Sequence, residues 1–147
     1  MDEYLLNKVQ CEFGITSQEV SPEEITQCLN IKPSRAYSKG DEFSTLNGTK
    51  TMNRAQNLWV IASDSVISAE EDISMHIRFF QNLFADKIDK IINYKNNDKV
   101  QVSFLINIKT EMTCYTFDLS NDEMQFLISI SNRISSTIFT KEKINKE

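Results

Sequence analysis

The stretch that decides the fold runs from residue 21 to residue 63, where SPEEITQCLNIKPSRAYSKGDEF (21–43) leads through a polar loop to NLWVIAS (57–63). SPEE (21–24) combines a capping serine, a proline at the first helical position and a glutamate three residues after the cap, which predicts a helix start. NLWVIAS is apolar on both faces, which predicts a central β-strand. The stretch therefore predicts a short helix, a Pro/Arg/Gly segment and then a buried strand.

Alternation with a period of two predicts strands on either side of this stretch. Residues 8–16 (KVQCEFGIT) place Val9, Cys11, Phe13 and Ile15 on one face, and residues 99–109 (KVQVSFLINIK) place Val100, Val102, Phe104, Ile106 and Ile108 on one face. We expect residues 112–119 (MTCYTFDL) to pair with 99–109 as an antiparallel hairpin. Residues 133–140 are predicted to form a last strand that carries Ile134, Ile138 and Phe139.

Two more helices are predicted by Ser-x-x-Glu capping boxes. SAEE (68–71) precedes an apolar stripe at helical spacing, which predicts one long helix over about 69–94. SNDE (120–123) predicts a further helix, with Met124, Leu127, Ile128 and Ser131 facing inward and Phe126 and Ile130 beside them.

These elements predict an α+β fold in the order β-α-β-α-β-β-α-β, a single mixed, mainly antiparallel sheet with helices packed on it, broadly ferredoxin-like. The chain has 147 residues and is 40% hydrophobic, which suits one domain with a substantial core. We expect this domain to cover residues 1–140, followed by a charged tail at 141–147 (KEKINKE).

Composition also bounds the partners and the compartment. A net charge of −5 argues against nucleic acid as a partner, and no apolar run approaches the roughly 18 residues that cross a membrane. The first residues, MDEYLLNKVQ, lack the basic start and apolar run of a secretory signal. Cys11, Cys28 and Cys114 form neither a CxxC pair nor a disulfide framework. We therefore expect a cytoplasmic protein with reduced thiols and no membrane partner.

The sequence carries no catalytic signature. It contains no GxSxG, no Walker loop and no GxGxxG. His76 is the only histidine, and no acidic residue or cysteine stands at metal-ligand spacing from it. We therefore predict that the protein is not an enzyme, and we predict no catalytic residues, no metal site and no cofactor.

Residues 30–57 hold the candidate binding residues. Five basic residues stand there against Asp41 and Glu42, a local net charge of +3. This balance predicts a loop that contacts an anionic ligand or an acidic protein face. One alternative is a solvated loop that happens to carry lysines. Another is that Arg35 and Tyr37 pack back onto the domain, with Arg35 covering the edge of the sheet. Trp59, the only tryptophan, suits the core better than a ligand platform. The candidates, from the loop 32–59, are Arg35, Tyr37, Lys39, Arg54 and Trp59.

PEEITQCLNIKPSRAYSKGD (22–41) followed by LWVI (58–61) resembles the bacterial family called domain of unknown function 4279. That family shows a P-x-x-I-T-x-x-L-x-I-x-P-(S/T)-R-A-x-x-K-G segment and then an aliphatic-Trp strand. LSNDEMQFLISISNRISSTIF (119–139) resembles its closing helix and strand. Two departures are Tyr37, where the family more often has Trp, and the long loop 41–56.

The resemblance implies a small cytoplasmic bacterial protein of unassigned activity. Small α+β domains of this kind recur beside bacterial toxin genes as immunity proteins, which implies a protein-interaction domain that neutralises a toxin by covering its active site. An acidic chain would suit a basic nuclease toxin, because complementary charge accelerates association. The alternative is a small-ligand or regulatory binding domain that uses the loop 32–59. No residue pattern decides between a monomer and a homodimer.

Overall fold

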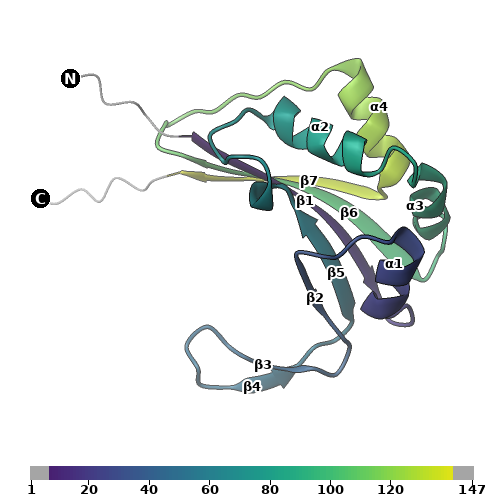
Figure 1. Ribbon diagram of the computed structural model, residues 1–147. Coiled ribbons are helices and arrows are strands. Elements are labelled where there is room, and N and C mark those ends of the chain that lie inside the picture. The colour runs from purple at the N-terminus through teal and green to yellow at the C-terminus, as the bar shows by residue number, and fades with distance from the viewer. Residues whose placement is uncertain (1–6, 141–147) are drawn as a thin grey trace, which may run out of the picture.

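The structure, a computed structural model, describes residues 7–140 of the chain (Figure 1). Its strands are β1 (Asn7–Ser17), β2 (Arg35–Tyr37), β3 (Glu42–Ser44), β4 (Thr51–Asn53), β5 (Asn57–Ala62), β6 (Val100–Thr110) and β7 (Arg133–Thr140). Its helices are α1 (Pro22–Leu29), α2 (Ile73–Leu83), α3 (Ile88–Lys95) and α4 (Asn121–Ile130), with a short 3-10 turn, η1 (Ser63–Ser65). No helix of this described part is long and apolar enough to cross a membrane.

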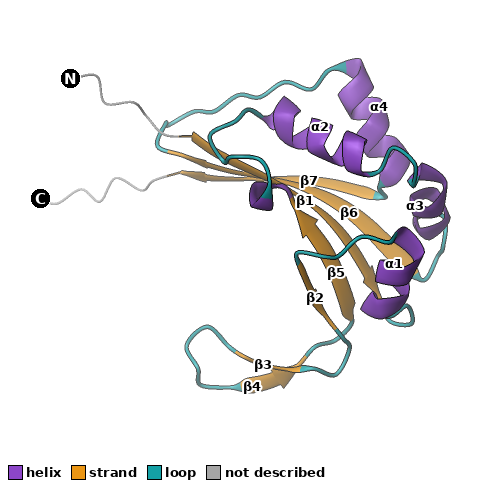
Figure 2. Cartoon of the chain, viewed as in Figure 1, coloured by secondary structure: helices purple, strands orange, loops and turns teal. Residues whose placement is uncertain are grey.

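Five of the strands form one sheet in the order β2-β5-β1-β6-β7. All neighbours are antiparallel except β6 and β7, which run parallel at one edge. The helices lie on one side of this sheet, and the separate β3–β4 hairpin lies on the other side (Figures 1 and 2). The predicted α+β class and mixed, mainly antiparallel sheet are confirmed. The predicted element order and the ferredoxin-like arrangement are not.

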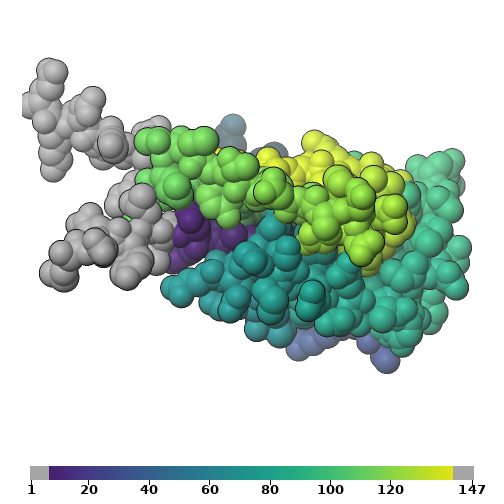
Figure 3. All heavy atoms as spheres, turned by 90° about the horizontal axis from the view of Figure 1, so that it is seen from above, coloured from purple at the N-terminus to yellow at the C-terminus, as the bar shows by residue number. Residues whose placement is uncertain are grey.

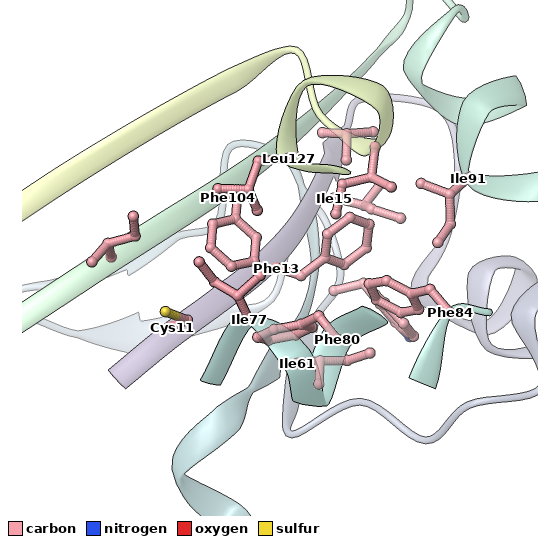
Figure 4. Packing of buried hydrophobic residues seen from close by; sticks show 14 of the residues in the cluster. Cys11, Phe13, Ile15, Ile61, Ile77, Phe80, Phe84, Ile91, Phe104 and Leu127 are labelled. Carbon is pink, nitrogen blue, oxygen red and sulfur yellow. The ribbon is translucent and has the colours of Figure 1, made fainter. Parts of the chain in front are cut away.

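The core forms between the helices and the alternate residues of the central strands. Cys11, Phe13 and Ile15 of β1 are fully buried, as their period-two spacing predicts. The Phe13 ring lies edge-on to Phe84, with centroids 4.7 Å apart, and Phe80 contacts Phe104 in the same way at 5.2 Å (Figure 4). β1 and β6 therefore supply the floor of the core, and α2 closes it.

Two of the three predicted helix starts are confirmed. The Ser21 hydroxyl accepts a hydrogen bond from the Glu24 amide, and Ser120 and Glu123 form a complete capping box at α4. The third prediction is wrong, because α2 is capped by Asp72, whose carboxylate accepts from the Met75 amide. Ser68 instead belongs to a turn in which its side chain accepts from the Glu70 amide.

The single helix predicted over 69–94 is also wrong. The chain bends after Leu83 and continues as α3 from Ile88. A straight helix of that span would be about 39 Å long, longer than the strands that it covers. The bend keeps both Phe84 and Ile91 fully buried, which a straight helix leaving the sheet could not do.

Residues 112–119 do not form the predicted hairpin strand. Because β7 runs parallel to β6, the chain must return along the sheet after Thr110, and it does so as an irregular segment leading to α4. Tyr115, Phe117 and Leu119 still alternate, but they pack against the core rather than pairing with β6. From above, this segment (green) runs beside the helix layer (Figure 3). The alternation in residues 112–119 therefore indicates that one side of the segment is buried, although the segment has no hydrogen-bonded partner strand.

Smaller differences concern α4 and the least regular stretch. Leu127 and Ile130 are the buried apolar residues of α4, whereas Met124 and Ile128 are 40% and 59% exposed, contrary to their predicted inward positions. Residues 30–57 contain three short strands, and β2 pairs with β5 at the edge of the sheet. The predicted charged tail at 141–147 lies outside the described residues.

Phe117→Ala should lower the free energy of unfolding by about 1–3 kcal/mol, because a half-buried ring loses its packing against the core. Asp118→Ala is the matched control, since Asp118 is exposed and adjacent. Urea unfolding of both variants measures the difference. Equal losses for the two would contradict a packing role for residues 115–119.

Candidate binding surface

The side of the sheet opposite the helices, here called the open face, carries the candidate residues of β2. The register places Arg35 beside Val60, then Gly14, Ser103 and Arg133 across the five strands. Tyr37 lies two residues along β2 and therefore on the same face. Along β6 and β7 this face carries mostly polar side chains, with Leu105 and Phe139 as apolar members, whereas the face that meets the helices is apolar.

Arg35 is held by a buried carboxylate. Its Nη1 and Nη2 atoms lie 2.8 and 3.1 Å from the two carboxylate oxygens of Glu12 on β1. The Glu12 side chain is 11% exposed and the Arg35 side chain 54%. Because β5 lies between β2 and β1, the Arg35 side chain reaches across β5 to Glu12. The hydrogen bonds to Glu12 raise the pKa of the guanidinium. Arg35 thus packs back onto the domain, as one of the predicted alternatives has it, but it reaches inward across β5 and does not cover the outer edge of the sheet.

Arg54 is stacked between two aromatic rings. Its guanidinium carbon lies 4.1 Å from the centroid of Tyr37 and 3.9 Å from that of Phe43. The segment 42–53, which contains β3, β4 and their turn, is called the arm below. Arg54 thus fixes the base of the arm against β2. Within the described residues its guanidinium forms no ion pair, so its N–H groups are available to an acceptor beyond these residues.

The other two candidates take different positions. The Lys39 amide donates to Asn57 Oδ1 at 2.7 Å, while the residue itself is exposed. Trp59 is fully buried on the helix side, where its Nε1–H donates to Thr26 Oγ1 at 3.0 Å. The preference for a core position at Trp59 is confirmed. The structure thus brings Arg35, Tyr37 and Arg54 to one surface, with Lys39 following on the chain, and leaves Trp59 beneath it.

The partners of these residues are not evident from the sequence. The alternation of residues 8–16 puts Glu12 on the face opposite Phe13, but its pairing with Arg35 depends on β2 lying next to β5. Further along the open face, Gln10 donates to Asp64 Oδ1 at 3.2 Å and accepts from Asn107 Nδ2 at 3.3 Å. These three side chains help to line a depression of about 140 Å³, together with Lys8 and Lys109. The even-numbered positions of 8–16 were the one signal that could have found Gln10 and Glu12.

His76 and Ser63 resemble a catalytic pair but lie in the core. Ser63 Oγ is 2.6 Å from His76 Nδ1 and accepts from the Cys11 amide, and His76 Nε2 lies 3.1 Å from the Ser68 carbonyl oxygen. Both residues are fully buried. His76 Nε2–H donates to the Ser68 carbonyl, and burial lowers the pKa of His76, which favours the neutral ring with Ser63 Oγ–H donating to Nδ1. This hydrogen-bond network links η1 and the start of α2 to β1.

The chemistry available on the open face is recognition by charge and stacking. A guanidinium with free N–H groups binds carboxylate or phosphate oxygens, and half-buried aromatic rings offer flat apolar contact. Among the described residues, no group of three or more His, Cys, Asp or Glu side chains could hold a metal ion.

Fold and surface together define a two-layer α+β domain whose sheet is covered by helices on one side and flanked by a projecting hairpin on the other. Comparison with known families matches residues 7–139 to the family described as "Domain of unknown function (DUF4279)". The chain therefore belongs to this family, as the resemblance at residues 22–41 predicts. No curated protein and no solved structure matches the chain.

Arg35→Ala should lower the free energy of unfolding by about 1–2 kcal/mol, because the mostly buried Glu12 carboxylate loses its partner. Lys32→Ala removes the same charge from an exposed side chain and should change stability little. In chemical denaturation, the double variant with Glu12→Ala should lose less stability than the sum of the two single variants. Strictly additive losses would show that the pair does not interact.

Stability should fall as the pH drops below about 6.5, because the pKa of His76 is lower in the folded chain than in the unfolded chain. The unfolded state then binds the proton more readily, so the contribution of neutral His76 is complete above that pH and is lost below it. His76→Gln should flatten this part of the stability profile in urea unfolding. An unchanged slope between pH values of about 5 and 7 would contradict the assignment.

Proposed function

We propose that this chain is a protein-binding domain of the bacterial cytoplasm that docks its partner through the arm and the adjoining open face. One observation carries the proposal. The arm projects on the side of the sheet away from the helices, and among the described strands β3 and β4 pair only with each other (Figure 1). Its turn and second strand nevertheless present apolar side chains to solvent, with Leu46 fully exposed and Met52 50% exposed.

Apolar side chains on a projecting hairpin gain free energy only when another surface covers them. Phe43 and Arg54 hold the base of the arm against Tyr37, so its direction is set before a partner arrives. A fixed arm loses less conformational entropy on binding than a flexible loop would. This combination of exposure and rigidity supports a docking role.

The finer proposal is an immunity protein, with a toxin as the partner whose active site the domain covers. Residues 30–57 carry a net charge of +3 in a chain of net charge −5, which leaves −8 for the remainder. The acidic remainder would attract a basic enzyme over a distance, and the arm would make the short-range contacts. The carboxylate groups of such a partner would be acceptors for Arg54.

The test is capture of the product of the adjacent gene, co-expressed with the tagged domain, by arm variants. Leu46→Asp and Met52→Asp should each reduce capture at least about tenfold, because a buried unpaired carboxylate opposes docking. Ile128→Asp is the matched control, since Ile128 is an exposed apolar residue on the helix side. Growth rescue from the toxicity of that product should follow the same order.

Capture and rescue that survive both arm variants would overturn the docking role of the arm. Arm-dependent capture of a partner without toxicity would leave the protein-binding domain and remove the immunity role.

A second candidate, a domain that binds a small anionic ligand, is favoured by the stacked Arg54 alone. Its guanidinium is positioned by two rings, and Lys39 is exposed nearby in the chain. If no partner depends on the arm, addition of inorganic phosphate should shift the NMR signal of Arg54 Nε–H and leave that of Arg78 unchanged. Equal, weak shifts at both arginines would contradict a ligand site at Arg54.

A further inference from the structure

The two edges of the five-stranded sheet differ in how they are protected. β2 has only three residues, follows Pro33 and carries Arg35, and these are features that discourage pairing with another chain. β7 has eight residues, RISSTIFT, with no proline, no glycine and a single charge at Arg133. The β2 edge is therefore protected by its short length, its proline and its charge. The β7 edge is long, lacks proline and carries only one charge.

β7 is also the most exposed long strand. It pairs with β6 along one side, and no described strand pairs with its other side. Ile134 and Ile138 are each 43% exposed and Phe139 is 54% exposed. In Figure 3 the strand (yellow) lies at the margin of the molecule rather than beneath the helices. An unprotected edge with apolar side chains on both faces is a site for strand addition.

We propose that β7 pairs with β7 of a second copy of this chain, antiparallel and about a two-fold axis at Ser136. The sequence of the strand is self-complementary in this register. Ile134 lies opposite Ile138 of the second copy, and Ser135 lies opposite its Thr137. Arg133 lies opposite its Phe139, where a guanidinium over an aromatic ring is favourable.

This register opposes no like charges and matches apolar to apolar residues on the helix side. A shift of two residues would place Ile134 opposite Ser136 of the second copy and would lose the Arg133–Phe139 contact. The resulting sheet has ten strands, with the helices of both copies on the same side. The arm and β2 lie at the far edge of each copy, so the pairing leaves the proposed docking surface free.

The first experiment measures mass in solution. The purified chain, of 17.0 kDa, should sediment as a dimer at a concentration of about 100 µM. Ser136→Lys puts two ammonium groups directly opposite each other on the axis and should weaken the dimer at least about tenfold. Ser44→Lys makes the same charge change at an exposed position of the arm and should leave the dimer intact. A monomeric wild-type chain, or equal weakening by both variants, would overturn the proposal.

The second experiment tests the register by cross-linking. In a Cys114→Ser background, Ser136→Cys should oxidise to a disulfide-linked dimer, since directly opposed residues in antiparallel strands have Cα atoms about 4.5–5.5 Å apart. Thr140→Cys is the matched control, because Thr140 would face Asn132 of the second copy rather than itself. Cross-linking through residue 140 but not through 136 would contradict the two-fold axis at Ser136.

Discussion

The strict alternation of β1 is the constraint on which the rest of the structure depends. Its odd-numbered residues from Val9 to Ile15 enter the core, and Phe13 touches both Phe84 and Trp59 there. Its even-numbered residues face the open side, where Glu12 receives Arg35. A shift of one residue in register would exchange the two faces and expose the apolar set. The same strand therefore fixes the core and the binding surface.

A continuous series of contacts leads from this strand to the arm. Glu12 fixes Arg35 on β2, β2 presents Tyr37, and Tyr37 stacks on Arg54 at the base of the arm. Phe43 closes the stack from the arm itself. Because the ion pair is mostly buried at its acidic end, it holds β2 more firmly than a three-residue edge strand could be held by backbone pairing alone. The position of the docking surface is therefore a consequence of the central strand.

Sequence alone predicts the parts of this fold that depend on local chemistry. β1, β5, β6 and β7 follow from their apolar patterns, and the starts of α1 and α4 follow from the serine caps at 21 and 120. Prediction from sequence fails for the segments whose course depends on the arrangement of the sheet. The bend after Leu83 and the unpaired course of 112–119 both depend on the span of the helix layer and on the parallel β6–β7 pair.

For the candidate surface, too, the sequence predicts the residues that are close in the chain and misses the contact that depends on the sheet. Charge counting and aromatic spacing find Arg35, Tyr37 and Arg54 within residues 30–57, because these residues are close in sequence. Charge counting and aromatic spacing cannot find Glu12, which lies 23 positions before Arg35. The contact between Glu12 and Arg35 exists only once β2 joins β5 beside β1. The core position of Trp59 is predicted correctly. Its apolar neighbours in NLWVIAS favour the core, and the pleat of β5 turns its side chain there.

Methionine footprinting tests the central claim most directly, because the chain has exposed methionines on both sides of the sheet. Met52 on the arm is 50% exposed, while Met75 and Met124 on α2 and α4 are each 40% exposed. Oxidation by hydroxyl radicals, followed by mass spectrometry, compares the domain alone with its captured partner complex. We predict that the partner protects Met52 and leaves Met75 and Met124 reactive. Protection of Met75 and Met124 with Met52 still reactive would contradict a docking surface on the open side of the sheet.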